Sequence, residues 1–366
     1  MAPAMWKPNY RLTNRIVNNL TAIEAARVIV DTARLTPGDL MDLSRQAKVR
    51  ATHYSTRIEG NRLTLKEAED VISGRRRVFY GRERDVAEVR NYWEALTYIE
   101  HLVVKKRPIT ENAIQRIAGI VINGKRNGIQ QYRTGQNVIR DSSNGGIVYM
   151  PPEAHDVPIL MSNLVEWIRQ AEVDRIPPAI VAGLSHYQFV TVHPYYDGNG
   201  RTARLLASLI LQRSGYGLGG IFSLEEYHSK NIEAYYDALD VGSHHNYYMG
   251  RSEADLTSWI EYFTDILVQV FENARVLASN YTHISSTQEL EAIHKLDHRA
   301  QVVVTLFNSQ EFITSADIAT TLGLSERMAR VLITKWVAED WLVVADTSRR
   351  ARKYTLGETY RQYLRQ

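Results

Sequence analysis

The residues best suited to chemistry in this sequence stand together in one short segment. The segment reads His193-Pro194-Tyr195-Tyr196-Asp197-Gly198-Asn199-Gly200-Arg201-Thr202-Ala203-Arg204, and a helical run follows it at once. Gly198 and Gly200 allow a tight turn whose N–H groups meet the start of that helix, where unpaired donors and the helix dipole favour an anion. The segment therefore predicts a phosphate-binding turn.

Four polar side chains around this turn have complementary properties. Arg201 and Arg204 are three residues apart, so their guanidinium groups project from one side of the helix and can bind different phosphates. Asp197 offers oxygen ligands for Mg²⁺, whose other ligands can be phosphate oxygens and water. The imidazole of His193, with an ordinary pKa of about 6.5, can accept a proton from an attacking hydroxyl group. Each residue alone is more often structural, but the combination favours phosphate chemistry.

The whole segment resembles the signature of Fic-domain proteins, His-Pro-(aromatic)-x-(Asp/Glu)-Gly-Asn-Gly-Arg-x-x-Arg, with Tyr195 where Phe is more usual. That family is all-helical and typically transfers AMP from ATP to a protein hydroxyl group. The resemblance implies that His193 is the general base and that Asp197 binds the Mg²⁺ that bridges the α- and β-phosphates. It implies further roles along the turn and helix: Gly198, Asn199 and Gly200 form the anion hole, Arg201 contacts phosphate and Arg204 binds the γ-phosphate. ATP and Mg²⁺ are the expected substrate and cofactor.

An earlier segment resembles the inhibitory motif of the same family, (Ser/Thr)-x-x-x-Glu-(Gly/Asn), with Ser55, Glu59 and Gly60 at its defined positions. The resemblance implies that Glu59 pairs with Arg204 and blocks the γ-phosphate. A carboxylate there would take the bidentate partner of the phosphate and add like-charge repulsion. In some relatives a glutamate of this type instead orients a water that removes AMP from a modified protein, so a de-AMPylase is an alternative.

Two more segments are candidates for substrate binding. Residues 136–150 predict a β-hairpin around a polar, glycine-rich turn. By resemblance this hairpin is a flap whose edge could align an extended target segment, and an ordinary surface hairpin is the alternative. Tyr235 and Tyr236 resemble a family stretch whose aromatic residue borders the adenine. Tyr236 is the nucleotide-binding candidate, and core packing is the alternative for either residue.

The elements that must position these groups are mostly helices. Helical periodicity from about Asn14 to about Lys295 predicts an all-helical body. A proline at the first helical position predicts a helix over 37–58, and Thr64 with Glu67 predicts a capping box for a short helix that ends near 73–74. Further helices are predicted over 83–105, 111–122, 157–171, 177–190 and from 254 through 271 and beyond.

The C-terminal part shows a different pattern. Helices over 314–322 and 326–339, followed by strands over 341–344 and 353–356, predict a winged helix-turn-helix domain. Basic side chains lie on its second helix and near its wing: Arg327, Arg330, Lys335, Arg349, Arg350, Arg352 and Lys353. They suit DNA contact. Glu326, Glu339 and Asp340 weaken the positive field, so an accessory role in substrate choice or oligomerisation is preferred to DNA contact.

Composition limits the remaining choices. The 366 residues are 44% hydrophobic and 23% charged, which indicates a globular protein of two or more domains. The absence of cysteine excludes disulfides, thiolate metal sites and thiol nucleophiles. A net charge of +3 is too small to attract polyanions by bulk charge. Without a secretory signal or an apolar run of about 20 residues, the expected location is cytoplasmic, with no membrane contact.

Together these patterns predict a mainly α protein with an all-helical Fic fold, a short β-hairpin flap and a C-terminal winged helix-turn-helix domain. The expected domains are 1–110 with the inhibitory helix, 111–295 as catalytic core and 296–366 as the winged helix. The expected function is a protein adenylyltransferase that transfers AMP from ATP to a Ser, Thr or Tyr hydroxyl of a target protein and of itself, autoinhibited by Glu59. A homodimer is expected. A DNA-binding regulator whose core senses nucleotide is the alternative from another class.

Overall fold

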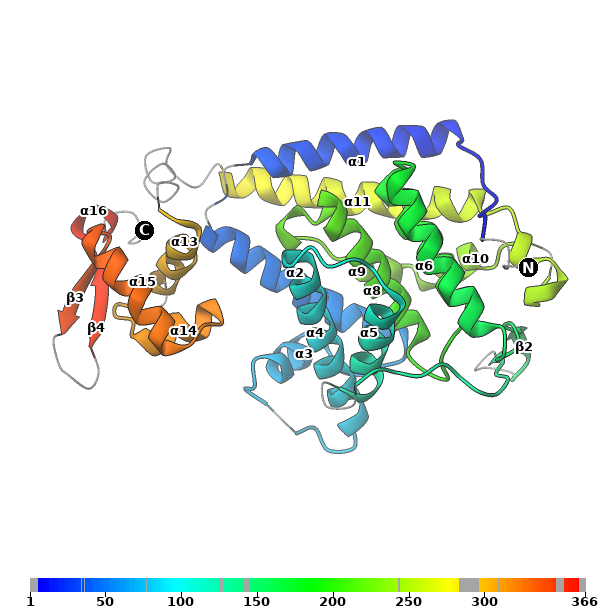
Figure 1. The fold of residues 1–366 in the computed structure, drawn as a ribbon, viewed down its shortest axis with the longest axis horizontal. Coiled ribbons are helices and arrows are strands. Elements are labelled where there is room, and N and C mark those ends of the chain that lie inside the picture. Colours follow the sequence, from blue (N-terminus) through cyan, green and yellow to red (C-terminus); the bar gives the residue numbers. More distant parts are fainter. Residues whose placement is uncertain are drawn as a thin grey trace. The chain divides into compact units, whose positions relative to one another are not determined.

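The described part of the chain consists mainly of α-helices, with two pairs of short antiparallel strands (Figure 1). This computed structural model describes residues 6–33, 35, 37–76, 78–124, 128–140, 145–242, 244–282, 296–308, 310–346 and 352–361. The chain divides into two units, one of residues 1–31 and 45–275 and the other of residues 32–44 and 276–366. The mainly helical fold class expected from the sequence is confirmed.

The larger unit contains all or most of eleven helices and the first strand pair among the described residues. They are α1 (Asn14–Thr32), α2 (Pro37–Ile58), α3 (Leu65–Ile72), α4 (Glu83–Val104), α5 (Glu111–Asn123), β1 (Ile139–Arg140), β2 (Ile147–Tyr149), α6 (Val157–Val173), α7 (Pro178–Val192), α8 (Asn199–Leu211), α9 (Leu224–Lys230), α10 (Ile232–Leu239) and α11 (Thr257–Thr282). Of the described helices, none has both the length and the apolar character needed to cross a bilayer.

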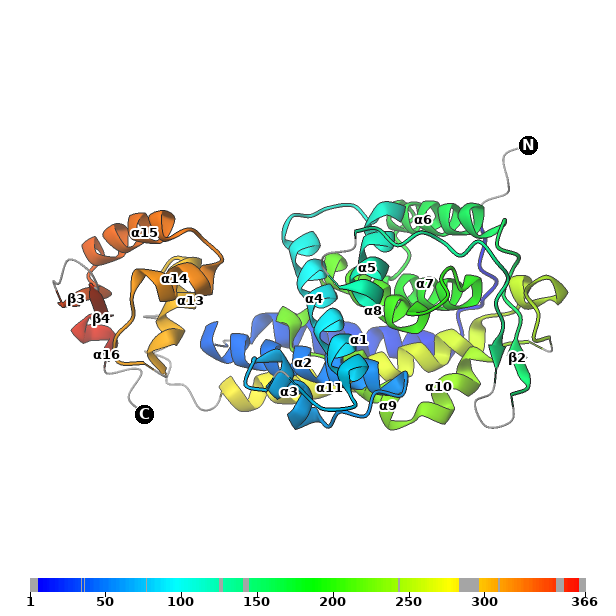
Figure 2. The same cartoon turned by 90° about the horizontal axis from the view of Figure 1, so that it is seen from below.

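Helices α7 and α8 form the centre of this unit. They pack against each other, and Figure 2 shows them beside α5 and α6, which they also contact. Nearly every residue of both helices is buried, because neighbouring helices cover them on several sides. Gly183 of α7 permits a close approach of α11: a Cβ there would lie 2.9 Å from the ring of Phe263. Trp259 of α11 also donates its Nε1–H to the Gly183 carbonyl at 2.7 Å.

Helix α1 lies along α11, although the two helices are far apart in the sequence (Figures 1 and 2). Polar contacts join the two helices: Asn19 Nδ2 donates to Asp265 Oδ1 at 2.7 Å and to the Thr264 hydroxyl at 3.1 Å. The apolar face of α1, with Ile16 and Ile23, is buried. The N-terminal helix is therefore part of the scaffold around the central pair.

Several helix limits agree with the sequence patterns. Helix α2 runs over the predicted 37–58, and α4, α5 and α6 begin at the predicted residues. The capping box before α3 is present: the Thr64 hydroxyl accepts from the Glu67 N–H at 3.2 Å, and Glu67 Oε2 accepts from the Thr64 N–H at 2.8 Å. The long α11 begins three residues later than predicted, because Asp255 Oδ1 accepts from the Thr257 N–H and fixes the helix start there.

The predicted hairpin is present but shorter than expected. Ile139 pairs with Tyr149 and Arg140 with Ile147, with an irregular register between the two pairs. Residues 141–144 of the predicted turn lie outside the described residues. After β2 the chain pairs with another segment, since the Met150 N–H donates to the His245 carbonyl at 2.8 Å. The hairpin is thereby tied to the loop that precedes α11.

The smaller unit contains a second strand pair among its described residues. Its elements are α13 (His298–Val304), α14 (Ser315–Leu322), α15 (Glu326–Ala338), β3 (Leu342–Asp346), β4 (Lys353–Leu356) and α16 (Glu358–Arg361). Trp336 and Trp341 are buried in its core. This order of helices and strands agrees with the sequence pattern, but the winged-helix assignment, DNA contact and the boundaries after residues 110 and 295 stay predictions. Arg349 and Arg350 lie outside the described residues.

The buried face of α8 supports a stability prediction. Leu209 is 1% exposed and packs in a cluster with Tyr92 and Ile117. We expect Leu209→Ala to lower the free energy of unfolding by about 2–5 kcal/mol, because it removes buried methyl groups and leaves a cavity. Urea denaturation of the full chain, followed by circular dichroism, measures this change. Leu12→Ala is the control, since Leu12 is 61% exposed. If Leu209→Ala lowers the free energy of unfolding no more than Leu12→Ala does, the assignment of α8 to the core is contradicted.

Candidate functional site

His193 lies at the C-terminal end of α7, in an unusual backbone conformation. Its φ of 51° and ψ of 58° place it in the left-handed region, which non-glycine residues rarely adopt. Its Nδ1 lies 3.2 Å from the Val190 carbonyl oxygen. A carbonyl can only accept, so Nδ1 carries the proton and Nε2 is the basic nitrogen of the neutral ring.

The surroundings of His193 favour this neutral form. The pKa of His193 is lowered to about 4, mainly by burial and also by the positive charge of Arg133, against opposing effects of Val190, Glu59 and Asp197. At neutral pH the imidazole is therefore able to accept a proton. This arrangement suits a general base more than a general acid.

The turn after His193 is closed by the Asn199 side chain. Asn199 Oδ1 accepts from the Tyr195 N–H at 3.0 Å, and Asn199 Nδ2 donates to the Tyr195 carbonyl at 2.8 Å. Gly198 has a φ of +77°, and α8 begins at the next residue. The residues predicted to form the anion hole thus make a turn at a helix N-terminus, and anion binding there stays a prediction. Since its side chain is used to close the turn, Asn199 has only its main chain to offer an anion.

Arg204 of α8 is buried and bound by α2. It is 2% exposed, and its Nε donates to the Ser55 hydroxyl, while its Nη2 donates to the Ser55 carbonyl and to Glu59 Oε1, each at 2.9 Å. Burial alone would lower the pKa of Arg204, but Glu59 and two tyrosines outweigh it and raise the pKa. The pairing of Glu59 with Arg204 that the family resemblance implies is present.

The Glu59 side chain also lies close in space to the first residues of α8. A Cβ built on Gly200 would lie only 2.4 Å from Glu59 Oε1. The carboxylate therefore occupies the space next to the Gly198–Gly200 turn as well as the guanidinium of Arg204. A negatively charged group already lies where the sequence predicts phosphate.

Arg201 is paired with carboxylates on both sides. Its side chain is 2% exposed, with Nη2 at 3.0 Å from Asp197 Oδ1 and Nη1 at 3.7 Å from Glu88 Oε1. Asp197 Oδ1 also accepts from the Gly198 N–H at 2.6 Å. The predicted phosphate contact and the predicted metal ligand are thus neighbours in one ion pair.

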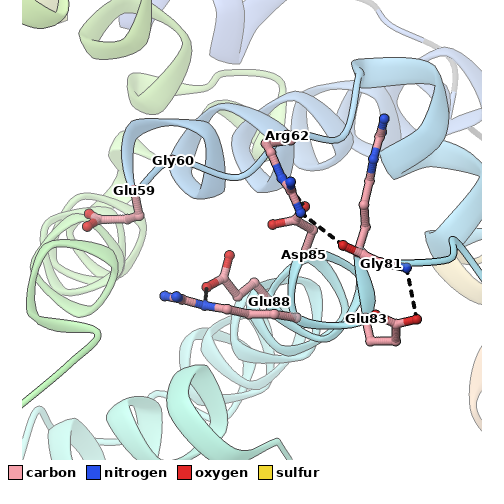
Figure 3. Close-up of a pocket in the computed structure, with 9 residues that line it drawn as sticks. Glu59, Gly60, Arg62, Gly81, Glu83, Asp85 and Glu88 are labelled. Atoms are coloured by element: carbon pink, nitrogen blue, oxygen red, sulfur yellow. Dashed lines mark hydrogen bonds and ion pairs between the residues drawn. The ribbon is translucent and has the colours of Figure 1, made fainter.

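The end of the α2 helix is held against α4. Asn61 Nδ2 donates to Glu88 Oε2 at 3.0 Å and to the Asp85 carbonyl at 2.9 Å, and Gly60 turns the chain with a φ of +89°. A polar cavity of about 290 Å³ lies beside this turn, lined by Glu59, Gly60, Arg62, Gly81, Arg82, Glu83, Arg84, Asp85 and Glu88. Figure 3 shows the Glu59 side chain at its edge, directed away from Arg62 and Asp85. The contacts of this turn with α4 therefore hold the chain next to Glu59, on the side away from Arg204.

A second cavity lies between the hairpin and α10. It has a volume of about 550 Å³ and is lined by Ile139, Arg140, Val148, Tyr149, Val190, Thr191, Tyr236, Asp237, Leu239, Asp240 and Arg251. Tyr236 is 51% exposed and borders this cavity, whereas Tyr235 is buried and its hydroxyl lies 3.1 Å from His186 Nε2. The structure thus separates the two tyrosines that the sequence left open: Tyr235 is a core residue and Tyr236 lines a cavity.

The described residues offer little for a metal by themselves. Among them no group of three His, Cys, Asp or Glu side chains is arranged to hold an ion. Mg²⁺ is usually held by one or two carboxylates, with phosphate oxygens and water as its other ligands. Asp197, beside the anion-binding turn, fits that single protein ligand.

Sequence reasoning missed three residues that fix this site: Asn61, Glu88 and Arg133. Asn61 contacts a residue 27 positions away, and Arg133 donates to the carbonyl of a residue 60 positions away. Neither contact leaves a periodic or spacing signal in the sequence. Both need the packed fold.

The chain is similar to known proteins of one family. Residues 108–211 match the Fic/DOC family. The protein adenylyltransferase Fic of Drosophila willistoni is 29% identical over 203 residues, which cover 54% of this chain and 38% of that protein. The Drosophila mojavensis protein of the same name is 32% identical over 178 residues, 47% of this chain and 33% of that protein. The chain spans only about a third to two fifths of the length of these curated relatives.

Solved structures show the same fold. A Fic family protein from Desulfovibrio desulfuricans G20 has a TM-score of 0.60 and 24% identity, covering 96% of this chain and 99% of that chain. A Fic domain containing signaling protein from Bacteroides thetaiotaomicron VPI-5482 has a TM-score of 0.62 and 23% identity, covering 72% and 97%. The fold and the site define a helical protein with a glycine-containing turn at a helix N-terminus beside a neutral imidazole. Over residues 108–211, and in its helical fold, the chain is similar to Fic-family proteins.

The low pKa of His193 gives a prediction that does not depend on activity. We expect its ring to stay neutral on acidification until about pH 4. A free imidazole, by contrast, would gain its proton near pH 6.5. Because the unfolded chain binds this proton more readily, His193 is expected to contribute a loss of stability as the pH falls from about 6.5 to about 4. NMR of selectively labelled histidine measures the titration, with His193→Asn to identify the signal. A midpoint near 6.5 would contradict the buried, neutral ring.

Proposed function

We propose that this protein is a protein adenylyltransferase, which transfers AMP from ATP to a hydroxyl group of a target protein and of itself, and that Glu59 holds it in an inhibited state. The observation that carries the proposal is the contact of Glu59 with Arg204 at 2.9 Å, next to the anion-binding turn and the neutral His193. The adenylyltransferase names of the curated relatives support the reaction type.

The triphosphate would bind along the turn and α8. Main-chain N–H groups at the start of α8 would bind phosphate oxygens, and Arg204 would bind the γ-phosphate once Glu59 leaves it. Arg201 lies on the same side, three residues earlier. Mg²⁺ would be held by Asp197 and phosphate oxygens, and when bound it would neutralise phosphate charge.

The nucleoside would occupy the cavity between the hairpin and α10. The about 550 Å³ cavity has room for a purine and its ribose, and Tyr236 offers an aromatic face to the base. Asp237 and Arg251 add polar groups at its wall. These residues would fix the end of the nucleotide that does not react.

The chemical step would be an in-line attack on the α-phosphorus. The hydroxyl oxygen of the target forms a bond to the α-phosphorus, and its proton passes to Nε2 of His193. The bond from the α-phosphorus to the oxygen that bridges it to the β-phosphorus breaks, and pyrophosphate leaves. Positioning of the two reactants and the fixed positive charge around the phosphates supply the catalysis.

The target would approach along the hairpin. Ile147 and Val148 of β2 are about half exposed, so an extended segment could pair with this edge and bring a Ser, Thr or Tyr side chain near His193.

We keep a homodimer and DNA contact through the smaller unit as hypotheses. A DNA-binding regulator whose core only senses nucleotide would bind DNA without forming any AMP-modified protein.

Release of Glu59 gives the main test. We expect Glu59→Gly to increase self-modification by labelled ATP about 10- to 100-fold, because loss of a charge-assisted hydrogen bond frees Arg204. Intact-protein mass spectrometry and label incorporation measure the product. His193→Ala in the same background should bind ATP but incorporate no AMP.

Matched carboxylates control this test. Glu83 lines the polar cavity beside Glu59 and has no contact with Arg204, so Glu59→Gln should activate and Glu83→Gln should not. Equal incorporation by all forms would refute the inhibitory role of Glu59. If pre-modified protein instead loses AMP only when Glu59 is present, the enzyme works in the direction of AMP removal.

A further prediction tests the nucleoside cavity. In the Glu59→Gly background, Tyr236→Ala is expected to weaken binding of magnesium ATP about tenfold, because a base loses its stacking partner. Isothermal titration calorimetry measures the dissociation constant. Tyr80→Ala is the control, since Tyr80 is 93% exposed and does not line this cavity. Equal constants for the two variants would exclude this cavity as the base site.

A further inference from the structure

Arg133 is a buried arginine whose hydrogen-bond partners are uncharged oxygens. It precedes β1 and is 3% exposed. Its guanidinium donates to the His193 carbonyl at 3.0 Å, the Gly135 carbonyl at 3.1 Å, Gln136 Oε1 at 3.2 Å and the Pro152 carbonyl. Within the described residues it has no carboxylate partner in an ion pair. Burial of an unpaired charge is unfavourable and lowers the pKa of Arg133. Hydrogen bonds to so many carbonyls suggest that the position of those carbonyls matters.

Two of these contacts fix the segment that carries the imidazole. The side chain of Arg133 binds the carbonyl of His193, and its main-chain N–H donates to the carbonyl of Pro194 at 2.9 Å. His193 has the left-handed backbone conformation described above. A non-glycine residue keeps such a conformation only where neighbouring contacts determine it. Arg133 supplies the contact on the carbonyl side of this residue.

The other contacts join this segment to both ends of the hairpin. Gly135 and Gln136 precede β1, and Pro152 follows β2. A further bond runs the same way, since the Gly135 N–H donates to the Tyr196 hydroxyl at 2.8 Å. One guanidinium therefore sets the distance between the hairpin and the end of α7.

We infer that Arg133 is a positioning residue for His193: its guanidinium holds the His193-Pro194 backbone in the left-handed conformation and fixes it relative to both ends of the hairpin. This inference rests on the proposed role of His193 as general base. A target segment paired with the hairpin would then meet the imidazole at a set distance. Arg133 touches none of the groups proposed to bind the nucleotide phosphates, so its effect should fall on the chemical step.

The charge of Arg133 gives a second, separable effect. The charged groups that influence the pKa of His193 are Arg133 from the segment before β1, Glu59 from α2 and Asp197 from the turn. Only Arg133 is positive, and it lowers the pKa together with burial. Loss of the charge, or opening of the loop to water, would raise the pKa of His193.

The experiment compares two substitutions in the full-length Glu59→Gly chain. Arg133→Met removes both charge and hydrogen bonds, whereas Arg133→Lys keeps the charge and loses the planar fork. The rate of AMP transfer in a single turnover should fall about 100-fold in Arg133→Met, because a small displacement of the base has a large effect. It should fall by less in Arg133→Lys. Calorimetric affinity for magnesium ATP should change much less than the rate.

A matched control and a second measurement complete the test. Arg169→Met is the control, since Arg169 is an exposed residue of α6 paired with Glu166. NMR titration of His193 should move from about 4 toward 6.5 in Arg133→Met and stay lower in Arg133→Lys. This measurement needs no AMP transfer, so it tests the influence of Arg133 on His193 even if the proposed reaction fails, and Arg133→Lys, which keeps the charge, separates positioning from charge.

Two results would overturn the inference. One is a folded Arg133→Met protein with a rate within about twofold of its parent and an unchanged His193 titration. The other result applies if circular dichroism shows that Arg133→Met does not fold: an unchanged rate of AMP transfer in Arg133→Lys would then contradict positioning. A lower rate in Arg133→Lys with a low His193 pKa would support it.

Discussion

The ion pair between Glu59 and Arg204 is the interaction on which the site depends. It joins residues 145 positions apart and brings the end of α2 against the start of α8. A buried guanidinium needs an anionic or hydrogen-bonding partner, since an unpaired charge is costly inside a protein. Arg204 therefore always requires a partner of this kind. In the proposed function, the carboxylate and a phosphate are two alternatives for one position, and the protein would change state by exchanging them.

The rest of the scaffold would keep the other groups fixed during the proposed exchange. Helices α7 and α8 are buried along nearly their whole length, and Asn199 closes the turn between them. Asn61 and Glu88 hold the chain just after Glu59 against α4. The proposed exchange would thus involve a short part of the site, the Glu59 side chain at the end of α2. A site of this construction needs little rearrangement to become ready for a nucleotide.

The sequence predicted most of the site because most of it is local. The residues from His193 to Arg204 are contiguous, so turn geometry and helix periodicity fix their mutual positions before any tertiary contact forms. The capping box at Thr64 is local as well, and it was predicted correctly. The choice between Tyr235 and Tyr236 was not local, because it depends on which side of α10 packs against His186. Arg133 and Glu88 could not be found at all, since their partners come from other elements.

Gly200 has a consequence for both of the proposed states, the inhibited one and the nucleotide-bound one. A Cβ there would lie 2.4 Å from the Glu59 carboxylate and 3.2 Å from a guanidinium nitrogen of Arg204. The absence of a side chain is what lets an anion come so close to the helix end, whether that anion is part of the protein or of a ligand. A methyl group at this position would therefore act against both occupants. Under the proposed function, restraint and substrate binding would share one steric requirement, and a change of this glycine that relieved one would impair the other.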